Sequence, residues 1–228
     1  MIRIEHIEIK IRKVFKTYFE NLGFSNRDNI EFIFKNDVIK ENITFNVSNK
    51  LSGFNISYCI SKRYEKIENV WQDLIIKFDL NLGDNMTIFI NNLSLGLFDN
   101  ILINRNSIDS DLLNFRNQFI IVYENDILPI LKQTEDIRWM DKILNSDLLD
   151  FDNPCKYFPY RGLFFKKIIV ARLANNPMFE EIYMTIKKMY EDYLKNNVNE
   201  KYSNELNVLN VLFERLKTIE PLKNPNLI

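Results

Sequence analysis

The residue types that most often do chemistry near neutral pH are scarce in this chain. Its 228 residues include one histidine, His6, and two cysteines, Cys59 and Cys155. Histidine is the usual proton shuttle, and the cysteine thiolate is a common nucleophile and metal ligand. No second histidine can complete a metal pair, and Cys155 would need a cation nearby to lower the pKa of its thiol. These counts disfavour cysteine catalysis and predict that His6, among charged neighbours, is a solvated histidine.

Glycine is equally scarce, and this bounds the nucleotide chemistry of the chain. A phosphate-cradling loop needs several glycines at fixed spacings, because only a backbone without side chains can approach the phosphates closely. Neither the P-loop pattern nor the dinucleotide fingerprint can be written from five isolated glycines. The usual nucleotide enzymes of those two types are therefore excluded. We expect no bound cofactor.

Aspartates cluster in a segment without helical or strand periodicity. Hard cations such as magnesium need little more than two or three carboxylate oxygens, so the cluster could serve a metal-dependent hydrolase such as a phosphodiesterase. The calcium-loop pattern fails, since a proline follows and the required glycine and distal glutamate are missing. Helix caps and loop solvation are the other interpretation of these carboxylates. The aspartates concerned are Asp147, Asp150 and Asp152.

The densest mixture of aromatic and basic side chains follows directly. Tyrosine and arginine are favoured where proteins bind one another, so this stretch is the candidate partner-binding surface. The other interpretation is that the aromatics fill the core while the cations reach out to water. The formal charge of -1 offers no global attraction to phosphate backbones, which leaves single-stranded nucleic acid the weakest candidate partner. The predicted contact residues are Lys156, Tyr157, Tyr160 and Arg161.

The first half of the chain is predicted to form an α+β framework. Apolar residues at helical spacing predict a helix that begins near Ile4 and ends at Gly23. Period-two alternation over 30–35, 43–48 and 54–61 predicts half-buried antiparallel strands, with a fourth strand near 86–90 and a candidate fifth at 101–103. Ser61 is expected to cap a second helix. The fold class is therefore an N-terminal helix plus an antiparallel meander sheet of about four strands, followed by an all-helical C-terminal half.

From residue 106 onward the periodicity is helical throughout. We expect parts at 1–105, with the sheet, and at 106–228, all helical, or else one continuous domain. A kink is predicted near Asn125, because Pro129 cannot donate a hydrogen bond to that carbonyl. The nearly apolar run 163–173 predicts a largely buried helix. Oligomeric state is left open by these patterns.

The location of the protein is argued from what the sequence lacks. No uncharged apolar run is long enough to cross a bilayer, and Arg3 and Glu5 interrupt any signal-peptide core. Two distant cysteines fit reduced thiols better than a disulfide framework. We expect a cytoplasmic protein without a membrane partner. The abundance of asparagine and isoleucine, with alanine only at Ala171 and Ala174, indicates an AT-rich genome, which we expect to be bacterial.

The layout resembles uncharacterised bacterial α+β domain families of unknown function. The shared features are a first helix ending in Asn21-Leu22-Gly23-Phe24, the strand meander, and the helical half with Asn175-Asn176-Pro177. Some families of this kind are encoded next to secreted toxins and are candidate immunity proteins. The resemblance implies a non-catalytic, protein-binding module of the immunity or inhibitor type, and it carries no site residues.

Overall fold

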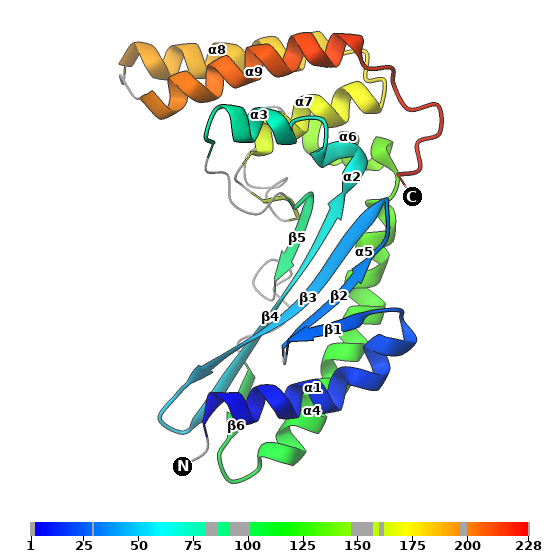
Figure 1. Ribbon diagram of the computed structural model, residues 1–228, viewed down its shortest axis with the longest axis vertical. Coiled ribbons are helices and arrows are strands. Elements are labelled where there is room, and N and C mark those ends of the chain that lie inside the picture. Colours follow the sequence, from blue (N-terminus) through cyan, green and yellow to red (C-terminus); the bar gives the residue numbers. More distant parts are fainter. Residues whose placement is uncertain are drawn as a thin grey trace. The chain divides into compact units, whose positions relative to one another are not determined.

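The chain forms two compact units, each built from separate stretches of sequence. The first unit comprises Met1–Arg63 and Ile88–Lys132, and the second comprises Tyr64–Thr87 and Gln133–Ile228. The predicted division near residue 105 follows the change from strands to helices, and as a domain boundary it stays a prediction. The computed structural model (Figure 1) describes residues 3–28, 30–80, 86–91, 101–146, 157–159, 162–196 and 200–227.

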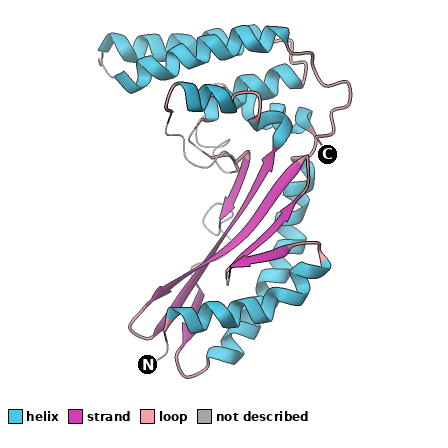
Figure 2. Cartoon of the chain, in the orientation of Figure 1, coloured by secondary structure: helices cyan, strands magenta, loops and turns pink. Residues whose placement is uncertain are grey.

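An antiparallel sheet forms the centre of the first unit (Figure 2). Its described strands follow the order β1-β2-β3-β4-β5, and β6 also pairs with β4. The predicted combination of an N-terminal helix, an antiparallel sheet and a helical second half is confirmed, with more strands than expected. The strands are β1 Ser25–Asp28, β2 Glu31–Lys35, β3 Ile39–Asn49, β4 Gly53–Tyr64, β5 Ile88–Asn91 and β6 Ile101–Asn104.

The helix predicted to start at Ser61 is wrong in its position. Ser61 lies in β4, where it and Lys62 pair with Phe89 and Ile88 of β5. This long-range pairing overrides the local helical spacing, and β4 continues to Tyr64. The remaining helical residues divide into two short helices, α2 Glu65–Glu68 and α3 Gln72–Lys77.

One face of the sheet is covered by α1 (Ile4–Asn21) and α4 (Ile108–Val122) (Figure 1). The covering helices and the strands meet in an aromatic cluster around Phe15, which is fully buried. Its ring stacks on Phe45 of β3 at 4.5 Å and meets Phe115 and Phe119 of α4 edge-on at 5.6 and 5.4 Å. Such aromatic pairs each contribute about 0.5–1.5 kcal/mol beyond the burial of their area. The cluster therefore fixes α1 and α4 against the sheet.

The kink expected near Asn125 takes the form of a π-helical turn. Between α4 and α5 (Leu128–Gln133), residues Tyr123–Ile127 form the π-helix η1. Pro129 has no N–H to donate, so the regular pattern of helix hydrogen bonds cannot continue through this point. The turn places Tyr123 inside, where its hydroxyl donates to Glu41 over 3.3 Å.

The second unit is helical in its described part. Its longer helices are α6 Ile137–Asn145, α7 Leu163–Leu173, α8 Phe179–Asn196 and α9 Glu200–Thr218. The prediction of a buried helix at 163–173 is confirmed, because α7 packs against α6, α8 and α9 and buries nearly all its side chains. Among the described helices, none combines the length and the apolar character that a bilayer crossing requires.

Candidate functional site

The two sites predicted from sequence fall largely outside the described residues. Tyr157 is described and is half-buried. Within the described ranges, no group of three or more histidine, cysteine, aspartate or glutamate residues could hold a metal ion. The aromatic-basic stretch and the aspartate cluster therefore both stay predictions. The predicted residues that lie outside the described ranges are Lys156, Tyr160, Arg161, Asp147, Asp150 and Asp152.

His6 and Cys59 have settings that account for them without chemistry. His6 is exposed in the first turn of α1, and its Nδ1 accepts a hydrogen bond from the backbone N–H of Arg3 over 3.3 Å. That contact belongs to a helix-capping arrangement. Cys59 is a free thiol on β4, and burial raises its pKa above the ordinary value. A thiol that stays protonated near neutral pH is a poor nucleophile. Cys155 lies outside the described residues.

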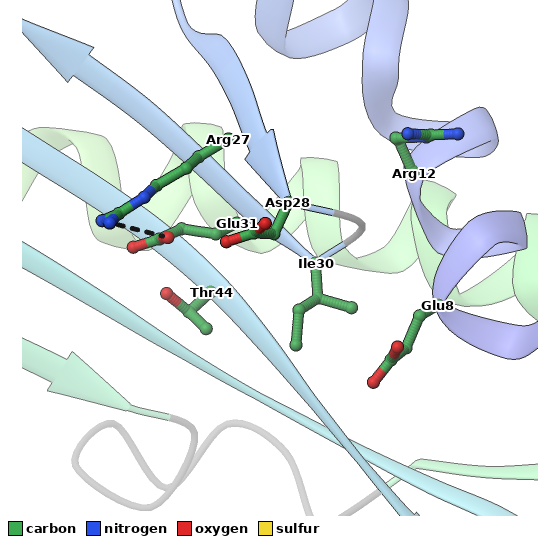
Figure 3. Close-up of a pocket in the computed structure, with 7 residues that line it drawn as sticks. All are labelled: Glu8, Arg12, Arg27, Asp28, Ile30, Glu31 and Thr44. Atoms are coloured by element: carbon green, nitrogen blue, oxygen red, sulfur yellow. Dashed lines mark ion pairs between the residues drawn. The ribbon is translucent and has the colours of Figure 1, made fainter. Parts of the chain in front are cut away.

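Charged side chains line an open hollow in the first unit, with a volume of about 570 Å³ (Figure 3). Helix α1 contributes one side of this charged hollow, and the end of the β1–β2 hairpin contributes the other. Three of the lining side chains are negative and two are positive. The residues of the charged hollow are Glu8, Arg12, Arg27, Asp28, Ile30, Glu31 and Thr44.

The hairpin side of the charged hollow is shaped by an irregularity in β1. The pairing of β1 with β2 slips between Asn26 and Asp28, so Arg27 has no register partner, as in a β-bulge. The Asn26 side-chain amide donates to the backbone carbonyl of Glu31 over 3.1 Å and to that of Asp28. These two bonds link β1 to the first residue of β2 and hold the backbone at Asp28 and Glu31, which carry two of the charges.

The charges in the hollow are only partly paired with one another. Arg27 Nη1 lies 3.8 Å from Glu31 Oε2. Asp28 stands directly opposite Glu31 in the strand register, an arrangement that is unfavourable for two like charges. Within the described part of the chain, the side chains of Glu8, Arg12 and Asp28 form no ion pair. The hollow therefore presents charges of both signs that remain available to an external group.

Sequence reasoning missed the charged hollow. Glu8 and Arg12 stand four residues apart on a predicted helix, which places them on one face, and Arg27, Asp28 and Glu31 crowd around one turn. These two local signals were readable. The proximity of these two groups of residues could not be predicted, because it depends on how α1 packs against the sheet, and no local spacing encodes that packing.

Comparisons of the chain with protein-family models, with curated proteins and with solved structures found no match. The resemblance to immunity-type families therefore stays a prediction. The support for a function comes from the geometry of the described residues, and in the first unit that geometry centres on the charged hollow.

The second unit contains a buried polar cluster around Glu68, whose side chain is fully shielded from solvent. Trp71 Nε1 donates to one carboxylate oxygen over 3.2 Å, and Thr87 Oγ1 donates to the other over 2.8 Å. Lys166 of α7 lies 3.4 Å from the carboxylate and also donates to the backbone carbonyl of Met86. Every described member of the cluster thus has a partner, which is typical of a network that specifies packing.

Proposed function

We propose that the protein is a non-catalytic, protein-binding module of the immunity or inhibitor type, acting in a bacterial cytoplasm. The observation that carries the proposal is the charged hollow, where charges of both signs without an ion-pair partner among the described residues lie on α1 and on the β1–β2 hairpin. Complementary charge arrays of this kind raise the association rate of two proteins and exclude wrong partners. Rigid supports lower the entropy lost on binding.

The layout resemblance and the scarcity of catalytic residue types support the same proposal. The aromatic-basic stretch from Lys156 to Arg161 stays the contact surface predicted from the sequence, because tyrosine and arginine are the residues that most often carry binding energy at interfaces.

Affinity capture from a native lysate, with mass spectrometry, tests the proposal. The intact protein is the bait, and the expected result is one protein recovered in stoichiometric amount. The same capture is repeated with Glu8→Lys plus Asp28→Lys, which reverses two charges of the hollow. Glu20→Lys plus Asp37→Lys is the matched control, since it reverses two exposed charges elsewhere in the first unit.

The expected outcome is that the partner is lost with the hollow variant and retained with the control. Failure to recover any stoichiometric partner would contradict the proposed function. Retention of the partner by the hollow variant, with loss on Tyr157→Ala, would move the binding surface to the aromatic-basic stretch. A toxin reading frame beside the gene would identify the partner class directly.

A further inference from the structure

The helix wall of the charged hollow carries two charges that have no ion-pair partner among the described residues. A glutamate four residues before an arginine is the favourable order for an ion pair along a helix. Glu8 and Arg12 have this order, yet they form no ion pair within the described residues. Both residues are only partly exposed, so their charges give up some of their hydration. A binding partner with opposite charges would restore the lost stabilisation.

The hairpin wall has an excess of negative charge, with two carboxylates and one guanidinium group. Asp28 stands opposite Glu31 in the strand register, and Arg27 compensates only Glu31. Each wall therefore combines carboxylate and guanidinium groups, and Asp28 is left without a cation among the described residues. Figure 3 shows the two walls as separate elements, with Glu8 and Arg12 on the helix and Asp28 and Glu31 on the hairpin.

Both walls are held in place before any partner arrives. On α1, Ile7 and Ile11 are fully buried and anchor the helix face that adjoins the hollow. On the hairpin, the Asn26 side chain donates hydrogen bonds to the backbone carbonyls of Asp28 on β1 and Glu31 on β2. Binding at the charged hollow therefore requires little ordering of the backbone, which favours affinity from a small number of contacts.

We infer that the charged hollow binds a segment of a partner protein that carries one basic and one acidic side chain within a few residues of each other. This rests on the proposed function and names the chemistry of its partner. The basic side chain pairs with Glu8 or Asp28, and the acidic side chain pairs with Arg12. A polyanion meets the carboxylates and a polycation meets the guanidinium groups, so the mixed lining rejects both.

Short peptides provide the probe. Each acetylated and amidated peptide contains one arginine and one glutamate, separated by one, two, three or four serines. Matched peptides replace arginine by citrulline and glutamate by glutamine, which keep the shape and remove the charge. The full-length, ¹⁵N-labelled protein is titrated with each peptide. We expect at least one mixed-charge peptide to shift the amide signals of Arg12, Asp28 and Thr44 and to saturate below about 5 mM, with no effect of the uncharged peptides.

A pair of charge-neutral variants locates the binding. Glu8→Gln plus Arg12→Gln leaves the net charge unchanged and is expected to weaken the best peptide by about tenfold or more. Lys16→Gln plus Glu20→Gln is the matched control. It removes an ion pair of 3.8 Å at the same spacing on the same helix, outside the hollow. The control is expected to bind like the wild type.

Several results would overturn the inference. One is that peptides with two arginines or two glutamates bind as tightly as the mixed peptide. Another is that Glu8→Gln plus Arg12→Gln retains full affinity for the peptide. The third is that no peptide shifts the amide signals of the charged hollow. These results are distinguishable from a failure of the proposed function. If a lysate partner is captured equally by the wild type and by Glu8→Lys plus Asp28→Lys, the protein binds its partner through another surface, and only the present inference fails.

Discussion

Glu68 and Lys166 form an ion pair inside the second unit, with 3.4 Å between Lys166 Nζ and a carboxylate oxygen, and both side chains are shielded from solvent. The pair joins α2 to α7, while Thr87 and Trp71 complete the bonding of the carboxylate. Two opposite charges buried in contact compensate each other, whereas removal of one leaves the other buried and destabilises the folded protein. The pair therefore specifies how the helices of this unit pack, more than it adds net stability.

Neutralising one partner of this pair should lower the free energy of unfolding far more than neutralising both. Glu68→Gln removes the charge from the carboxylate that Lys166 contacts inside this unit and is expected to lower the free energy of unfolding by about 3–5 kcal/mol. The double variant Glu68→Gln plus Lys166→Met is expected to recover a large part of that loss. Urea denaturation followed by tryptophan fluorescence measures both. A double variant no more stable than Glu68→Gln would show that the pair is not coupled.

Gly162 is predicted to tolerate substitution less well than Gly23, although both have a positive φ. It begins α7 with φ +72°, and an added Cβ would lie 2.5 Å from Cη2 of the buried Trp71 ring. Gly162→Ala therefore combines left-handed strain of about 1–2 kcal/mol with overpacking of about 1–3 kcal/mol. Gly23→Ala is the control, because Gly23 has φ +86° but its Cβ would meet the Phe34 ring at an ordinary 3.4 Å. Equal losses of stability in the two variants would contradict the clash.

Asp73 should make the free energy of unfolding depend on pH in the acidic range. A bidentate contact from Arg215, at 2.6 and 2.7 Å, holds the pKa of Asp73 at about 2, below its ordinary 3.8. Because the folded-state pKa is the lower one, this contribution is complete above pH 3.8 and disappears as the pH falls toward 2. Solvent exposure of Asp73 limits it to below about 1 kcal/mol.

The measurement compares wild type and Asp73→Asn. The difference in their free energies of unfolding, obtained from urea titrations at several pH values, should be constant near neutrality and shrink below pH 3.8. A difference that does not change with pH would indicate that the Arg215 contact stabilises Asp73 by packing alone.

Cys59 is expected to resist alkylation in the folded protein. Burial raises the pKa of its thiol, so the reactive thiolate is scarce near pH 8. In a Cys155→Ser background, iodoacetamide should modify Cys59 more slowly in the native protein than in the same protein unfolded by urea. Mass spectrometry of timed samples follows the reaction. Faster modification of the native protein would mean that its surroundings activate the thiol.

The fold was predictable where burial follows a local period. Phe54, Ile56, Tyr58 and Ile60 alternate in sequence, and all four are buried on one face of β4. β1 was not predictable in the same way, because Ser25–Asp28 contains no apolar residue and becomes a strand through its pairing with β2. Long-range pairing also explains why β4 continues through Ser61.

The candidate site was less predictable than the fold. A charge pattern identifies which residues share a helix face, but it does not say which distant segment faces them. Glu8 and Asp28 are twenty residues apart, and they line one hollow only because α1 packs beside the hairpin end. The lysines of α7 illustrate the same limit, since Lys166 stands in an apolar run and is buried because Glu68 lies opposite.

The discontinuous make-up of the two units has a consequence for anyone who wishes to dissect the protein. The backbone passes from one unit to the other after Arg63, Thr87 and Lys132. No single scission yields two intact pieces. A fragment ending at residue 105 would be deprived of Phe115 and Phe119, whose rings enclose Phe15. In genetic screens that use truncated baits, a lost interaction should therefore reflect misfolding of the bait. Such screens should use all 228 residues.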